Sequence, residues 1–236
     1  IFEANFNNLE SDLRVETYLL SISEHNGELA PDEDTFGRLS MWRAYARKDG
    51  VAFVLSNTPF VAESNSLNAY TYPVSYDTRE SFCSKFEKVV SALEENMDFV
   101  KSLGGNGLHH ALENTFRLAC QSTKHPAFRE EREWRVIYSP TLLERQGLMT
   151  EVQNERLIPE IVSLGGVPQK VYALPFRDYP EEGFIGATIP SLLDKVLLGP
   201  TSDPYPIWQA YTAKLEEKGV HDVSNKVLIT GVPLRH

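Results

Sequence analysis

The sequence predicts an α+β protein, in which a mixed, mostly antiparallel sheet is flanked by helices and carries a helical-hairpin insertion. Short apolar runs typical of strands occur along the whole chain, from Thr17–Ser23 near the start to Lys226–Thr230 near the end. Amphipathic helical stretches lie between these runs and are not gathered at one end of the chain. A chain of 236 residues can bury a substantial core, so we predict a single domain over residues 1–236.

The first half of the chain alternates between strand and helix patterns. After the first strand, apolar residues recur at helical spacing between Phe36 and Lys48, and Asp49-Gly50 ends that helix. Val51–Leu55 and Ala69–Tyr76 are the next predicted strands. Two helices follow, over residues 81–103 and 108–123, and we expect residues 78–124 to form the helical insertion.

The second half continues the alternation. The predicted elements are strands over residues 131–139, 170–174, 195–198 and 226–230, and a helix over residues 205–218. Gly199-Pro200 closes the third of these strands, because neither residue favours a continued strand. Interspersed strands and helices of this kind are typical of a sheet covered by helices.

Composition restricts the classes of function. The formal net charge is −10, which argues against broad nucleic-acid binding through clustered Lys and Arg. No apolar run is long enough to cross a membrane, so no membrane partner is expected. The two cysteines are far apart and indicate reduced thiols in a cytoplasmic protein. The six histidines show no metal-ligand spacing, and no metal site is predicted.

The stretch FREEREWRVIY, residues 128–138, is the most informative for function. As a strand it would place Glu131, Glu133 and Arg135 on one face, because side chains alternate between faces. The other face, packed in the core, would hold Trp134, Val136 and Tyr138. The two carboxylates would lie about 6–7 Å apart. Like charges at that distance raise the pKa of at least one of the two.

Two interpretations of this stretch remain open. Paired carboxylates suit reactions through an oxocarbenium-like sugar cation, in which one stabilises the cation and the other orients or deprotonates the acceptor. Alternatively, the charges form an Arg/Glu ladder on a solvated strand end, in which Arg135 neutralises Glu133.

Two other segments carry candidate binding residues. Ser21, Ser23 and Glu24 lie at the end of the first predicted strand, where site residues commonly lie. Arg43 and Arg47 lie one turn apart on the first predicted helix and could grip phosphate. The alternative for these arginines is a solvated basic face.

Several motifs in order resemble an uncharacterised bacterial family that carries a domain-of-unknown-function label. The motifs are SISE, MWRAY followed by GVAFVL, EREWR, KVLLGP and a closing VLITGVPLR. Family members read roughly S-F-S-E, M-W-x-x-Y, E-x-E-W-R and I-x-L-G-P, and the resemblance covers residues 17–236. The family usually opens with a Y-x-Y-R strand and an F-N-D-P segment. We expect that these either lie upstream of Ile1 or have diverged here.

The same arrangement is more distantly similar to ADP-ribosyltransferase-type toxins. Those proteins have a serine-bearing second strand and a late strand that starts with a catalytic glutamate. The resemblance implies that Glu133 is the catalytic carboxylate and Glu131 its partner, with NAD as the substrate. It implies substrate-binding roles for Ser21, Ser23, Glu24, Trp42, Arg43, Tyr45, Arg47 and Arg135.

The leading hypothesis is therefore a cytoplasmic bacterial toxin or phage-defence enzyme that transfers ADP-ribose, or another ribosyl or glycosyl group, from a nucleotide-like small molecule. The alternative is a non-catalytic ligand- or partner-binding module of a defence operon, in which EREWR is a structural ladder. A protein partner is left open in either case.

Overall fold

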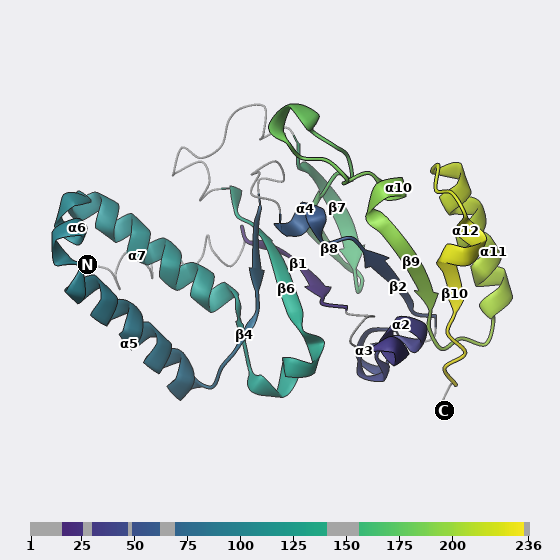
Figure 1. Cartoon of the computed structure of the whole chain (residues 1–236), viewed down its shortest axis with the longest axis horizontal. Helices are drawn as coiled ribbons and strands as arrows, with labels where there is room; N and C mark the ends of the chain where they lie inside the picture. The colour runs from purple at the N-terminus through teal and green to yellow at the C-terminus, as the bar shows by residue number, and fades with distance from the viewer. Residues whose placement is uncertain (1–15, 26–29, 47–48, 62–68, 141–155, 234–236) are drawn as a thin grey trace. The chain divides into compact units, whose positions relative to one another are not determined.

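The computed structural model describes residues 16–25, 30–46, 49–61, 69–140 and 156–233 (Figure 1). The chain divides into two compact units. The first unit comprises residues 1–23 and 69–149, and the second comprises residues 24–68 and 150–236. Helices and strands are interspersed in both units, which confirms the predicted α+β class.

The described part of the first unit contains strands, two long α-helices with a short one between them, and one short 3-10 helix. Its elements in chain order are β1 (Tyr18–Ser23), β3 (Tyr70–Pro73), β4 (Ser75–Tyr76), α5 (Arg79–Glu95), α6 (Met97–Ser102), α7 (Gly104–Gln121), β5 (Thr123–Lys124), η1 (Pro126–Glu131) and β6 (Glu133–Tyr138).

The main sheet of the first unit has β6 at its centre, with β1 and β3 antiparallel on either side. The register places Ser23 opposite Glu133, and Ser21 opposite Arg135. The two serines therefore lie on the strand next to the charged start of β6. A second, parallel pair joins β4 to β5.

The helical part of the first unit begins with a well-defined cap. Thr78 accepts a hydrogen bond from the Ser81 amide at 3.3 Å, which satisfies one amide of the first turn of α5. The helix predicted over residues 81–103 is broken at Asn96, where α5 ends and α6 begins. Phe86 and Phe116 contact edge to face with ring centroids 5.4 Å apart, so α5 and α7 lie side by side (Figure 1).

The second unit contains a small sheet, a hairpin and several helices. Its elements are α2 (Pro31–Phe36), α3 (Leu39–Tyr45), β2 (Val51–Leu55), α4 (Thr58–Val61), β7 (Ile158–Leu164), β8 (Val167–Ala173), η2 (Pro180–Glu182), α10 (Ile189–Leu192), β9 (Leu193–Leu198), α11 (Pro204–Glu217), α12 (Val223–Lys226) and β10 (Val227–Ile229).

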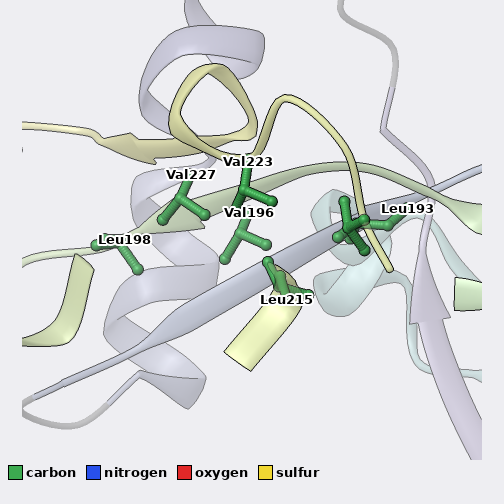
Figure 2. Packing of buried hydrophobic residues seen from close by; sticks show 7 residues of the cluster. Leu193, Val196, Leu198, Leu215, Val223 and Val227 are labelled. Carbon is green, nitrogen blue, oxygen red and sulfur yellow. The ribbon is translucent and has the colours of Figure 1, made fainter. Parts of the chain in front are cut away.

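The core of the second unit forms around β9, which pairs in parallel with β10 and antiparallel with β2. Helices α11 and α12 pack on these strands, and Figure 2 shows the buried side chains that meet there. Val196 of β9 is completely buried, and the Trp208 indole donates to the Val227 carbonyl at 2.9 Å. The cluster consists of Leu193, Val196, Leu198, Leu215, Val220, Val223 and Val227.

The hairpin of β7 and β8 was predicted only in part, because the sequence pattern indicated a strand over residues 170–174 alone. The turn between the strands contains Gly165 and Gly166, with φ of 61° and 86°. Consecutive positive φ angles belong to the turn type that closes tight hairpins, and glycine adopts them without strain.

The strands differ from the single mixed sheet that the sequence predicted. Those of the described residues form four separate sheets, three of them small antiparallel or mixed sheets and one a parallel pair. The strand predicted over Ala69–Tyr76 is interrupted at Val74, whose amide donates to the Glu133 carbonyl at 2.8 Å. A single domain over the whole chain stays a prediction.

Candidate functional site

Glu133, the first residue of β6, lies at the centre of a cluster of charged side chains in the first unit. Its side chain is only 6% exposed. The Ser21 hydroxyl donates to Oε1 at 2.6 Å, and Arg135 Nε donates to the same oxygen at 2.9 Å. Lys124 Nζ donates to Oε2 at 3.1 Å. Both oxygens of the carboxylate are therefore held by neighbouring side chains.

The backbone of Glu133 is fixed as well. Its amide donates to the Tyr76 hydroxyl at 2.7 Å, and its carbonyl accepts from the Val74 amide at 2.8 Å. Contacts at the amide, the carbonyl and the carboxylate leave this residue little conformational freedom. The carboxylate is consequently preorganised.

The surroundings of Glu133 decide its ionisation. Desolvation by burial raises the pKa of this carboxyl, but hydrogen bonds from Arg135, Ser21 and Lys124 outweigh burial and lower the pKa to about 2. The sequence had suggested that a nearby like charge raises at least one pKa. For Glu133 the direction is opposite, because cations surround the carboxylate.

Glu131 does not lie on the strand, so the predicted alternation from Glu131 to Glu133 is wrong. It is the last residue of η1, and Arg132 then adopts a left-handed conformation with φ of 45°. This turn precedes the start of β6. Glu131 nevertheless joins the cluster, because its carboxylate contacts Lys124 and its carbonyl accepts from Ser23 Oγ at 2.5 Å.

Lys124 of β5 bridges the two glutamates and was not among the predicted site residues. Its ammonium contacts both carboxylates and lies 4.8 Å from the centre of the Phe128 ring. Burial alone would lower the pKa of Lys124, but the hydrogen bonds to Glu131 and Glu133 raise it overall. No spacing rule links this lysine to the glutamates, because the β4–β5 pairing and the 3-10 helix bring it there.

The two faces of β6 also differ from the prediction. Val136 and Tyr138 are buried as expected, whereas Trp134 is only partly buried. Ile137, on the face that the sequence assigned to Glu133, is 1% exposed. The solvated ladder is therefore wrong in one respect, because Glu133 and Ile137 are buried. Arg135, which is partly buried, does pair with Glu133.

The remaining predicted binding residues belong to the second unit. Glu24 is exposed, and its carbonyl accepts from Arg38 Nη2 at 2.9 Å. Arg43 is exposed on α3, while Arg47 lies outside the described residues. Their proposed roles in binding stay predictions.

Trp42 and Tyr45, both on α3, lie in different surroundings. Trp42 is buried, and its indole donates to the Phe36 carbonyl at 2.7 Å. A Cβ at Gly199 would lie 2.7 Å from this ring, so the indole is closely packed. Tyr45 is exposed to solvent. Packing explains Trp42 without a ligand, whereas Tyr45 is accessible.

The described part of the chain also bears on metals and membranes. Within it, no group of three or more His, Cys, Asp or Glu side chains has an arrangement that could hold a metal ion. None of its helices has the length and apolar character needed to cross a membrane.

The fold and the site define an α+β protein with a buried, ion-paired glutamate at the start of a central strand. Residues 41–136 of this chain match the model of a family described as "Protein of unknown function (DUF2971)". The matched residues include MWRAY and EREWR, and the match confirms the resemblance to an uncharacterised family. No curated protein and no solved structure matches the chain. The similarity to ADP-ribosyltransferases stays a prediction.

Proposed function

We propose that this chain is a cytoplasmic, ADP-ribosyltransferase-like enzyme that uses NAD, with Glu133 as the catalytic carboxylate. One contact carries the proposal: Ser21 Oγ of β1 donates to Glu133 Oε1 at 2.6 Å. The resemblance implies a serine-bearing second strand and a late strand that starts with a catalytic glutamate, and β1 and β6 are neighbours in this chain. A toxin or phage-defence role is the biological setting of the proposal.

The charge state of Glu133 suits the reaction. With a pKa of about 2, the carboxylate is ionised at neutral pH. In the proposed step the bond between the nicotinamide nitrogen and the ribose carbon breaks, and nicotinamide leaves with the electron pair. The carboxylate of Glu133 stabilises the resulting sugar cation. Because Ser21, Arg135 and Lys124 already fix its position, little reorganisation accompanies the step.

Glu131 has the second role in this proposal. A nucleophilic group of the acceptor forms the new bond to the ribose carbon, and its proton passes to the Glu131 carboxylate. Lys124 contacts both carboxylates and keeps them in one cluster. The overall products are the ADP-ribosylated acceptor, nicotinamide and a proton.

The test is nicotinamide release from NAD by the wild-type chain and by Glu133→Gln. We expect the variant to lose about 100-fold or more in rate, the usual scale for removing a preorganised electrostatic contact. Asp77→Asn is the matched control, because Asp77 of the same unit is 5% exposed and pairs with Lys85. The pKa of Asp77 is likewise lowered to about 2, mainly by hydrogen bonds from Lys85 and Ser75.

The control separates catalysis from stability. Each variant removes one buried, ion-paired carboxylate, so both should lower the temperature of unfolding, but only Glu133→Gln should stop turnover. Ser21→Ala is the second variant, and we expect a smaller loss of rate with little loss of stability. Full activity of folded Glu133→Gln would exclude the catalytic role.

A second candidate function is a non-catalytic ligand- or partner-binding module. It is favoured by the burial of Glu133, whose carboxylate is 6% exposed and bonded to side chains at both oxygens. On this alternative the cluster only stabilises the first unit. Absence of both nicotinamide release and thermal stabilisation at millimolar NAD would favour it over the enzyme.

A further inference from the structure

The second unit contains an open pocket at the meeting point of α3, β2 and α11. Its volume is about 600 Å³. Pockets that hold small molecules have volumes of about 300–1,000 Å³. Its lining includes Tyr45 from the end of α3, Phe53 from β2 and Tyr211 from α11. The pocket is therefore of a size that accepts a small organic molecule.

Aromatic side chains form much of the wall. Tyr45 is 62% exposed and Phe53 is 51% exposed. The Phe53 and Tyr211 rings meet edge to face, with centroids 5.9 Å apart and an angle of 65° between their planes. Large aromatic side chains are costly to expose, and their faces carry a negative quadrupole that attracts cations.

Asp49 adds a formal negative charge to the negative faces of these aromatic rings. Among the described residues that line the pocket, it is the one charged side chain. Thr201 Oγ1 donates to Asp49 Oδ1 at 2.7 Å, which orients the carboxylate. A carboxylate beside aromatic faces favours a ligand that is both positively charged and partly apolar.

The wall behind the pocket is closely packed. The Gly199 amide donates to the Gly50 carbonyl at 2.9 Å, which joins the end of β9 to the start of β2. A Cβ at Gly50 would lie 2.0 Å from the Ala46 Cβ, so no space separates this strand from the residue after α3. Because these elements are in close contact, the pocket is formed before any ligand binds.

We propose that this pocket binds a small organic cation, a protonated amine that carries an aromatic or alkyl body. The body packs against Tyr45, Phe53 and Tyr211, and the ammonium group lies near Asp49. The site uses residues of the second unit alone and does not depend on Glu133 or on the proposed transferase activity.

Titration calorimetry with the whole chain at low ionic strength tests the proposal with three probes of one shape. Tryptamine combines an indole with an ammonium group, indole lacks the charge, and indole-3-acetate reverses it. We expect tryptamine to bind tightest and indole-3-acetate to bind at least about tenfold more weakly, a difference of about 1.4 kcal/mol. Equal affinity of the charged probes, or no heat with millimolar tryptamine, would overturn the proposal.

Variants of the lining residues identify the site. We expect Asp49→Asn to weaken tryptamine about five- to tenfold and to leave indole unchanged, because only the charge contact is lost. Tyr45→Ala should weaken both probes, and its exposed position makes a folding defect unexpected. An unaltered affinity of Asp49→Asn for tryptamine would contradict the assignment.

Two controls complete the experiment. Asp32→Asn removes an exposed carboxylate of α2 outside the pocket lining and should leave tryptamine affinity within about twofold of the wild type. Glu133→Gln should also bind tryptamine normally, so failure of the transferase proposal and failure of this one are distinguishable. Loss of binding in both controls would mean that tryptamine associates through net charge alone, which overturns the site.

Discussion

Glu133 shows how a few hydrogen-bond donors can stabilise a buried carboxylate. Removing a carboxylate from water is costly, and the cost is offset only when good hydrogen bonds surround it. Here Arg135, Lys124 and Ser21 supply them, and the pKa of Glu133 falls to about 2 against the effect of burial. The same set of contacts would suit a catalytic carboxylate or a structural one, so activity must distinguish the two.

The lowered pKa of Glu133 makes stability depend on pH. A carboxyl whose pKa is lower in the folded state stabilises the fold above its unfolded pKa of 4.5, and this contribution is lost as pH falls toward 2. We expect the difference in free energy of unfolding between wild type and Glu133→Gln to shrink by roughly 3 kcal/mol between pH 5 and pH 2. Denaturant titrations across this range measure it.

The comparison with Asp77→Asn is again the control, because its carboxylate has a pKa lowered to about 2 from a smaller starting value of 3.8. The difference in free energy of unfolding between wild type and Asp77→Asn should also shrink as pH falls, but by a smaller amount. If the difference in free energy of unfolding between wild type and Glu133→Gln stayed constant with pH, the ion pairs would not be what lowers the pKa of Glu133.

At the scale of elements, the helix predicted over residues 36–48 is α3, Leu39–Tyr45, and a turn at Gly37 separates it from α2, a helix that the sequence did not predict. Gly37 has φ of 68° after α2, and a Cβ there would lie 2.8 Å from the Trp42 ring. Gly199, after β9, approaches the other part of the same indole. Trp42 therefore connects α2, α3 and the end of β9, which explains glycine at both positions.

Gly199→Ala tests this packing. The new Cβ would lie 2.7 Å from Trp42 Cε3 and 3.0 Å from the Gly50 carbonyl oxygen. We expect the free energy of unfolding to fall by about 1–3 kcal/mol, as for other overpacked sites. Gly105→Ala is the matched control, because nothing lies within 4 Å of a Cβ there. We expect Gly105→Ala to change the free energy of unfolding by no more than about 1 kcal/mol. Any change should be stabilising, because alanine is favoured over glycine in a helix.

At the scale of the whole molecule, the chain passes between its two units three times, after residues 23, 68 and 149. Each unit is therefore made of two separate segments of the chain, and a segment of the other unit lies between them in the sequence. We expect this connectivity to make unfolding cooperative, and a single domain over the whole chain stays a prediction.

Calorimetry can test the single-domain prediction with one cavity in each unit. Ile137→Ala in β6 and Leu198→Ala in β9 each remove a side chain that is 1% exposed. We expect each to cost about 2–5 kcal/mol and to move one common unfolding transition. Ile161→Ala, at an exposed position of β7, should leave that transition nearly unchanged. Two transitions, each shifted by one variant alone, would contradict a single cooperative domain.

The sequence by itself determined the fold class and the elements whose patterns are local. Val51–Leu55 is β2 with the predicted bounds, and the helix predicted over residues 205–218 is α11, Pro204–Glu217. Apolar periodicity specifies such elements because the neighbouring residues alone decide which face is buried. The sequence also placed Ser21, Glu133 and Arg135 among the candidate site residues, and the side chains of Ser21 and Arg135 both donate to the Glu133 carboxylate.

Only the tertiary structure decided how that site is built. The left-handed turn at Arg132 ended the expected alternation, and the pairing of β4 with β5 brought Lys124 between Glu131 and Glu133. The division of the strands into separate sheets likewise had no local signal. These features depend on contacts between residues far apart in the chain, and the ionisation of Glu133 follows from those contacts.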